Sequence, residues 1–219
     1  MTFHTEAVAA ECRRALELLR GQDWLQSFYL AGGTALALQL GHRISIDLDW
    51  FSAQPVLMAG EHGATLDALR RLGPFEMRHE EEGQLYGQLA GADVSFVRMH
   101  HKLLEPTVDF NGAQLASPFD IGVMKLAAIN QRGTRRDFVD LYCLRSIASI
   151  QQLTAAAEVN YADRPSFLDI TSRALAYFDE AEQQPMPRVL WSDVDWPDVK
   201  RYCQAGAKWL VAHQRARYA

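Results

Sequence analysis

The chain has few of the features that mark secreted, membrane or zinc-binding proteins. Its 219 residues include only three cysteines, widely spaced and without a Cys-x-x-Cys pair, so we expect buried thiols in a reducing compartment rather than disulfides or a zinc site. No apolar run approaches the roughly 20 residues needed to cross a bilayer. The first residues lack a basic segment followed by an apolar one. We therefore expect a cytoplasmic protein without membrane contact.

An excess of positive charge is also absent. Lys and Arg number 22 against 27 Asp and Glu, which gives a formal net charge of −5. This balance argues against a general electrostatic grip on nucleic acid, although it leaves room for a local basic patch. There is no low-complexity tract, and a composition of 48% hydrophobic and 22% charged residues is ordinary for a globular protein. The chain is long enough for one large domain or two small ones.

The hydrophobic patterns change character near Pro118. Before it, we predict an amphipathic helix, short strands and further helices, at residues 5–20 (helix), 28–31 (strand), 34–40 (helix), 44–51 (strand), 61–72 (helix), and 75–80, 84–89 and 93–99 (a meander of strands). After it, we predict helices at residues 118–131, 136–148, 150–160, 166–178 and 196–217. The predicted fold is therefore α+β: a small mixed β-sheet core over 1–116, followed by a C-terminal α-helical region over 117–219 that packs on the core.

A strand-to-helix turn at Gly32, Gly33 and Thr34 is the first candidate site. Glycines let the backbone approach a ligand closely. A helix start offers unpaired N–H groups and a partial positive charge, both of which suit a phosphate. Thr34 can cap the helix or donate its hydroxyl to a phosphate oxygen. The alternative is purely steric, because a tight turn uses glycine whatever it binds.

Two carboxylates form the second candidate site. The alternation over 44–51 places Asp47 and Asp49 on one strand face, and Ile44, Ile46, Leu48 and Trp50 on the other. Neighbouring like charges repel, and a cation between them removes that cost. Hard oxygen ligands favour Mg²⁺ or Mn²⁺ over zinc. The alternative is a solvated acidic face, but the short helix after the glycine turn predicts that phosphate cradle and metal ligands share one sheet edge.

Longer stretches of sequence around these two sites make the pattern specific. Residues 30–38 (LAGGTALAL) and 41–51 (GHRISIDLDWF), continued by 120–129 (DIGVMKLAAI), 131–133 (QRG) and 137–142 (DFVDLY), resemble the AbiEii/AbiGii toxin family, a branch of the polymerase-β-like nucleotidyltransferases. The resemblance covers roughly residues 28 to 145. It implies a nucleotidyltransferase core, an NTP donor and, in toxin members, tRNA as acceptor together with a cognate antitoxin protein.

The same resemblance assigns roles to individual residues. It places the metal-binding aspartates on Asp47 and Asp49, and a later lysine and aspartate thought to face the nucleotide on Lys125 and Asp137. We thus expect these four to be catalytic, and expect nucleotide contacts from Gly32, Gly33, Thr34, Arg43, Ser45 and Ser95. Two alternatives stay open at this point. Lys125 could snorkel with a hydrated ammonium, and Asp137 could merely pair with nearby arginines.

One departure from the family pattern concerns a third carboxylate on a neighbouring strand. Ser95 takes that position here, while Asp93 shares its face two residues earlier. Sites for two metal ions need ligands for both. Without the third carboxylate we expect the triphosphate-bound metal to survive and the hydroxyl-activating metal to weaken, unless Asp93 or Asp137 compensates.

The sequence therefore predicts a Mg²⁺-dependent nucleotidyltransferase that moves an NMP from an NTP to an acceptor hydroxyl, as the toxin of an AbiE-like toxin–antitoxin pair. Two alternatives come from other classes. An Asp-x-Asp pair also serves sugar-nucleotide glycosyltransferases, but the Gly-Gly-Thr turn would then have no role. The other alternative is a nucleotide- or partner-binding module with a decayed site, which Ser95 makes plausible.

Overall fold

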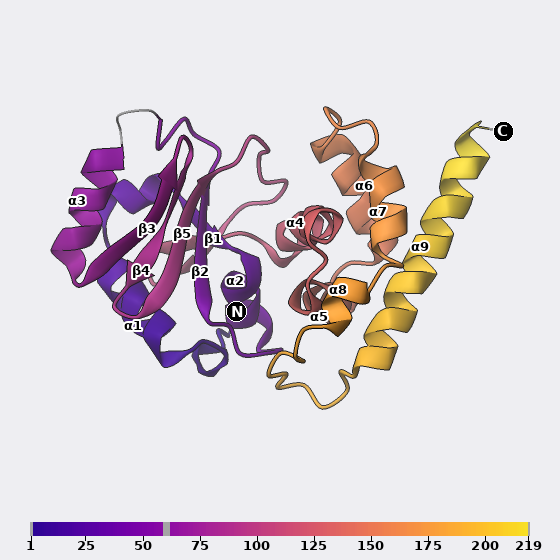
Figure 1. Ribbon diagram of the computed structural model, residues 1–219, viewed down its shortest axis with the longest axis horizontal. Coiled ribbons are helices and arrows are strands. Elements are labelled where there is room, and N and C mark those ends of the chain that lie inside the picture. The colour runs from indigo at the N-terminus through magenta and orange to yellow at the C-terminus, as the bar shows by residue number, and fades with distance from the viewer. Residues whose placement is uncertain (1, 59–61, 219) are drawn as a thin grey trace. The chain divides into compact units, whose positions relative to one another are not determined.

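The computed structural model describes residues 2–58 and 62–218 and divides into two compact units, Met1–Ser117 and Pro118–Ala219 (Figure 1). We call them the first and the second unit. Within the described ranges, every helix is too short or too polar to cross a membrane. The thiols of Cys12, Cys143 and Cys203 are buried, as the sequence predicts.

The first unit is a mixed sheet with helices against it. The helices are α1 (Ala10–Leu19), α2 (Gly32–Leu40) and α3 (His62–Leu72), and the strands are β1 (Tyr29–Ala31), β2 (Asp47–Ser52), β3 (Phe75–Glu81), β4 (Gln84–Leu89), β5 (Ala92–Arg98), β6 (Val108–Phe110) and β7 (Ala113–Leu115). The strand order is β3-β4-β5-β2-β1-β7-β6, with parallel pairing at β5–β2 and β1–β7. The predicted mixed sheet and the meander of β3, β4 and β5 are confirmed. Residue 61 of the predicted 61–72 helix lies outside the described residues.

The N-terminal segment corrects two predicted boundaries. The backbone of Ser45 exchanges hydrogen bonds with Ala7 and Ala9, at 2.9 Å each. This pairing keeps the segment after the short turn Thr5–Ala7 extended, so α1 begins at Ala10 and not at residue 5. Ser45 thereby belongs to a bridge outside β2, which starts only at Asp47.

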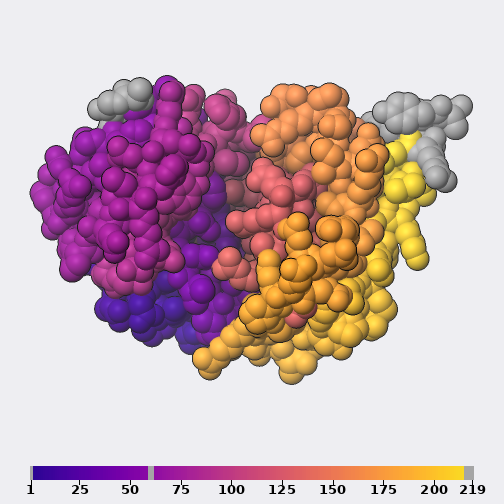
Figure 2. All heavy atoms as spheres, in the orientation of Figure 1, coloured from indigo at the N-terminus to yellow at the C-terminus, as the bar shows by residue number. Residues whose placement is uncertain are grey.

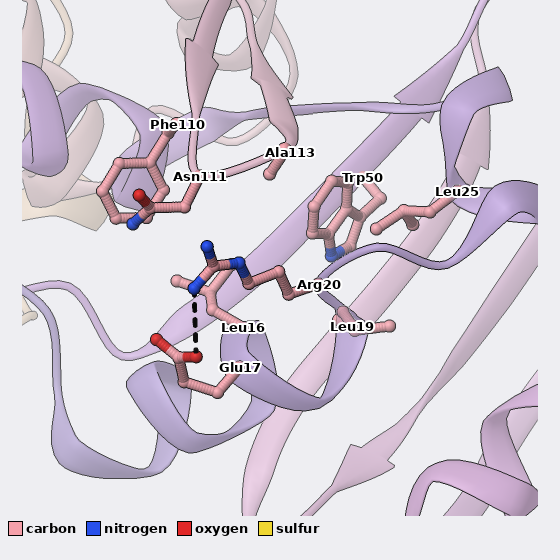
Figure 3. A pocket seen from close by; sticks show the side chains of 10 residues that line it. Leu16, Glu17, Leu19, Arg20, Leu25, Trp50, Phe110, Asn111 and Ala113 are labelled. Carbon is pink, nitrogen blue, oxygen red and sulfur yellow. Dashed lines mark ion pairs between the residues drawn. The ribbon is translucent and has the colours of Figure 1, made fainter.

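The buried face of β2 packs toward α1, which lies with α3 on one side of the sheet in Figure 1. Leu48 and Trp50 are fully buried, and Trp50 stacks on Phe96 with ring centroids 6.4 Å apart. Trp50, Leu16 and other residues line a small cavity of about 20 Å³, whose mouth carries the Glu17–Arg20 ion pair (Figure 3). The alternation thus holds within β2. It is wrong for Ile46, which is 60% exposed because it precedes the strand.

A hairpin that the sequence analysis did not predict completes the sheet. Strands β6 and β7 pair antiparallel around Asn111 and Gly112, whose φ angles are 53° and 87°. Asn-Gly at the centre of a hairpin is the pair that tolerates two positive φ angles in succession. Strand β7 then pairs with β1 next to the glycine turn.

The regular elements of the second unit are helices throughout its described part, with one bridge residue at Val189, which confirms the predicted C-terminal helical region. Its helices are α4 (Pro118–Gln131), α5 (Arg135–Cys143), α6 (Ile150–Asn160), α7 (Phe167–Ala174), α8 (Asp179–Glu182) and α9 (Trp196–Tyr218). Helices α5, α6 and α7 pack against both α4 and α9. Gly206 on α9 allows close approach to α6, since a Cβ there would lie 2.4 Å from Ile150 Cδ1. The predicted helices at 136–148 and 166–178 are shorter than expected, and end at Cys143 and Ala174.

The solvent exposure of the first unit varies along its sheet. Strand β3 lies at one end of the strand order and is exposed along almost its whole length. In the space-filling view, α3 and the β3–β4 hairpin fill much of the magenta surface of this unit (Figure 2). Strands β1 and β2 lie in the interior of the sheet, where the glycine turn and the aspartates meet.

Candidate active site

The glycine turn begins where β1 ends. Ala31 pairs with Asp49 of β2, and Gly32 follows with a φ of 61°, in the left-handed region that glycine tolerates best. A Cβ added at Gly32 would lie 2.6 Å from Asp49 Oδ2. The Asp49 carboxylate therefore lies against the turn, in space that only glycine leaves.

Behind the turn lies a buried cation. A Cβ at Gly33 would lie 2.3 Å from Arg43 Nη2 and 3.0 Å from Ser45 Oγ. Arg43 is 2% exposed and Ser45 is fully buried, and the guanidinium donates to the Ile44 carbonyl at 3.1 Å. Arg43 and Ser45 thus support the turn from inside and place a positive charge next to its backbone.

Thr34 ties the start of α2 to the start of β2. Its hydroxyl donates to the backbone carbonyl of Asp47, and the side chain is 1% exposed. The side-chain cap considered from the sequence is absent, since Thr34 does not cap the helix, while the expected phosphate contact stays a prediction. The hydrogen bond to the Asp47 carbonyl fixes the distance between the turn and the first aspartate, so the two predicted constellations form one unit of structure.

The parallel pairing of β2 and β5 decides what lies beside the two aspartates. Asp49 is in register with Ser95, and Asp47 with Asp93, so all four side chains share one face of the sheet. Ser95 donates a hydrogen bond of 2.7 Å to Asp49 Oδ1. Asp93 accepts hydrogen bonds from Arg78 at 2.8 Å and from Gln88 at 3.2 Å. Ser95, not Asp93, is therefore the side chain that contacts Asp49 across the strands.

The Cys12 thiol on α1 is buried and lies within the electrostatic influence of this acidic face. Burial, and then the charges of Asp47, Glu11, Asp93 and Asp49, raise the pKa of Cys12 to about 12. The thiol is therefore protonated at neutral pH, which makes it a poor nucleophile.

Two predicted site residues, Lys125 and Asp137, meet inside the second unit. The Lys125 ammonium lies 2.9 Å from Asp137 Oδ1 and 2.6 Å from Asp140 Oδ2. Exposure of the three side chains is 7%, 1% and 0%, so the alternative of a hydrated, snorkelling lysine is wrong. Asp137 also pairs with Arg132 at 3.2 Å, so the pairing with an arginine that was considered from the sequence is present, in addition to a pairing with Lys125 that was not.

The Asp137 carboxylate is ionised in spite of its burial. Burial alone raises its pKa, but the charges of Lys125 and Arg132 and hydrogen bonds from Thr134 and Lys125 outweigh that cost and lower the pKa to about 2. Thr134 is also the N-cap of α5 and accepts from the Asp137 amide. The sequence analysis paired Lys125 with neither Asp137 nor Asp140. The signal available for Asp140 was its position three residues after Asp137, on the same helix face.

The site in the first unit suits a hard cation and a phosphate. Asp47 and Asp49 lie on the same face of β2. The Asp49 carboxylate occupies space beside Gly32 that a Cβ would fill. Oxygen donors of this kind fit Mg²⁺ or Mn²⁺. Among residues 2–58 and 62–218, no three His, Cys, Asp or Glu side chains group closely enough to hold a metal ion. A metal ion at this pair of carboxylates would need water and phosphate oxygens to complete its coordination.

Comparisons with known proteins point to one family. The family described as "Nucleotidyl transferase AbiEii toxin, Type IV TA system" matches residues 14–84 and 102–195. The chain is 30% identical over 205 residues to the uncharacterised protein aq_aa25 of Aquifex aeolicus (strain VF5), which covers 90% of this chain and 95% of that protein.

Solved structures share the fold at low sequence identity. MenT4, a nucleotidyltransferase toxin from Mycobacterium tuberculosis, matches with a TM-score of 0.56 and 15% identity, over 93% of this chain and 86% of that one. JHP933 from Helicobacter pylori matches with a TM-score of 0.50 and 14% identity, over 94% and 91%. At these identities the two structures establish the fold alone. The family match covers most of the sequence, and the chain belongs to the AbiEii family of nucleotidyltransferase toxins.

Proposed function

We propose that this chain is a Mg²⁺-dependent nucleotidyltransferase that transfers an NMP from an NTP to a hydroxyl of an RNA acceptor, with tRNA as the first candidate. The observation that carries the proposal is the contact between the Asp49 carboxylate and the Gly32 backbone. A metal held by the aspartates and a phosphate held by the turn would then lie within one coordination sphere of each other.

The residues divide the chemistry between them. Asp47 and Asp49 would hold the divalent ion, which when bound neutralises charge on the triphosphate and polarises the phosphoryl group under attack. The N–H groups at the start of α2 would donate hydrogen bonds to phosphate oxygens, helped by the helix dipole. Arg43 adds a buried positive charge behind Gly33, and so stabilises an anion at the turn without reaching into the solvent.

Lys125 and Asp137 carry a second part of the proposal. The family resemblance assigns both residues to contacts with the nucleotide. Their buried ion pair holds the two charges in place before any ligand binds. We propose, from the resemblance, that both residues serve nucleotide transfer, with Asp137 keeping the Lys125 ammonium charged and oriented. A cognate antitoxin would complete the pair in the cell, as the family description implies.

Incubation of the protein with each radiolabelled NTP in turn, Mg²⁺ and total tRNA tests the proposal. Label should enter tRNA with the wild type, fall to background with Asp49→Asn, and persist with Asp93→Asn, whose carboxylate pairs with Arg78 instead. NTP binding without transfer to any RNA would support the binding module. Transfer from a labelled sugar nucleotide would support a glycosyltransferase.

A further inference from the structure

The Asp49 carboxylate is held from two sides. Its Oδ1 accepts the 2.7 Å hydrogen bond from Ser95, and its Oδ2 lies against the Gly32 backbone, 2.6 Å from where a Cβ would be. Ser95 is 6% exposed, and its position is fixed by the register between β2 and β5. A buried hydroxyl in a regular strand has little freedom, so the hydrogen bond selects one orientation of the aspartate.

Asp93, the other acidic side chain considered for the position beside Asp49, is bound by other residues. Asp93 lies one pair further along the same face, opposite Asp47. Its Oδ1 is bound by Arg78 and Gln88, both from the β3–β4 side of the sheet. Ligation of a metal by that oxygen would require Asp93 to give up a charge-assisted hydrogen bond.

We propose that Ser95 is the positioning residue of this metal site, and that the site holds one divalent ion. Ser95 holds the Asp49 carboxylate over the turn without adding a negative charge. This inference rests on the proposed function, since it concerns the ion that Asp47 and Asp49 would bind. It goes further in assigning the stoichiometry of the site and the role of a residue that carries no charge.

The number of ions follows from the number of anionic ligands. Two divalent ions roughly 3.5–4 Å apart repel each other and are held together only by several shared carboxylates. Here the described residues supply Asp47 and Asp49, whose two negative charges balance one divalent ion. The Ser95 hydroxyl donates to Asp49 and so acts as its outer partner. Loss of such partners typically costs about 10–100-fold in metal affinity.

Titration of Mn²⁺ by electron paramagnetic resonance, with no nucleotide present, tests the inference. The wild type should bind one ion per chain. Ser95→Ala should bind one ion about 10-fold or more weakly, and Ser95→Thr, which keeps the hydroxyl, should restore the affinity. Ser95→Asp adds a third carboxylate beside Asp49 and should raise the stoichiometry to two. Thermal melts of each variant confirm that it is folded, and Asp93→Asn serves as the matched control with unchanged binding.

The results separate this inference from the proposed function. Two ions on the wild type, wild-type affinity in Ser95→Ala, or a single ion on Ser95→Asp would overturn the inference while leaving Asp47 and Asp49 as ligands. Loss of an ion in Asp93→Asn would make Asp93 the ligand in place of Ser95. If Asp49→Asn binds Mn²⁺ like the wild type, the metal site of the proposed function itself is wrong.

Discussion

The ammonium of Lys125 lies 2.9 Å from a carboxylate oxygen of Asp137, and both side chains are almost fully buried. With Asp140 as the second partner of the lysine, one ammonium pairs with two buried carboxylates in the second unit. Lys125, which the family resemblance assigns to contacts with the nucleotide, is therefore also part of the packed interior of its unit. Under the proposed function, a substitution of Lys125 would act on stability and on nucleotide binding together.

Lys125→Ala should destabilise the protein by about 3–5 kcal/mol, because it leaves buried carboxylates without their cation. Urea denaturation measures this loss. Arg132→Ala is the matched control: the arginine pairs with the same Asp137 but is 59% exposed, so its removal should cost about 1 kcal/mol or less. Equal stability of Lys125→Ala and wild type would mean that the ion pair contributes nothing to the fold.

The low pKa of Asp137 makes stability depend on acid pH. Its pKa is about 2 in the folded chain against an ordinary 3.8, so its contribution is fully present above pH 3.8 and is lost as pH falls through the folded value. This lowering of the pKa corresponds to about 2 kcal/mol of folding free energy. Urea unfolding between pH 5 and roughly pH 2 should show this loss in the wild type, and a smaller slope in Asp137→Asn. An identical slope in the two proteins would assign the acid sensitivity to other groups.

Gly32→Ala should abolish metal-dependent NTP binding. The substitution brings a Cβ to 2.6 Å from Asp49 Oδ2 and strains a φ of 61°, at a cost of roughly 1–2 kcal/mol in stability. Gly63→Ala on α3 is the control, because nothing lies within 4 Å of its Cβ. It should keep binding and be as stable as the wild type or slightly more stable. Normal NTP affinity in Gly32→Ala, measured by calorimetry, would remove the turn from the site.

Asp47→Asn should leave the metal-free protein as stable as the wild type or slightly more stable, since it removes one of two neighbouring negative charges. Its fold contact with Thr34 runs through the backbone carbonyl, which the substitution keeps. Transfer activity should be lost. Thermal melts with and without Mg²⁺ check both statements: the wild type should gain stability from Mg²⁺ and the variant should not. A large drop in the melting temperature without metal would make Asp47 a structural residue.

Local patterns predicted the parts of the fold that depend on local physics. The glycine turn, the alternation of Asp47, Leu48, Asp49 and Trp50, and the meander all follow from residue spacing. The Asn111–Gly112 hairpin had an equally local signal, two residues that accept positive φ, and was overlooked. The start of β2 was wrong for a different reason, because the pairing of Ser45 with the N-terminal segment is a contact between distant parts of the sequence.

In the candidate site, too, some features follow from local spacing and others depend on tertiary contacts. Spacing placed Asp47 and Asp49 on one face, but only the strand register shows that Ser95 contacts Asp49 while Asp93 is bound by Arg78. Burial of Arg43 behind Gly33 likewise depends on tertiary packing, and no local pattern distinguishes it from an exposed arginine.

The central claim is that the glycine turn and the two aspartates form one metal–triphosphate site. Calorimetric titration of a non-hydrolysable NTP analogue into the protein, in Mg²⁺ and in EDTA, tests it most directly. The account predicts binding in Mg²⁺ that weakens at least 10-fold in EDTA and in Asp49→Asn, and is unchanged in Asp93→Asn. Equal affinity of wild type and Asp49→Asn in Mg²⁺ would contradict it.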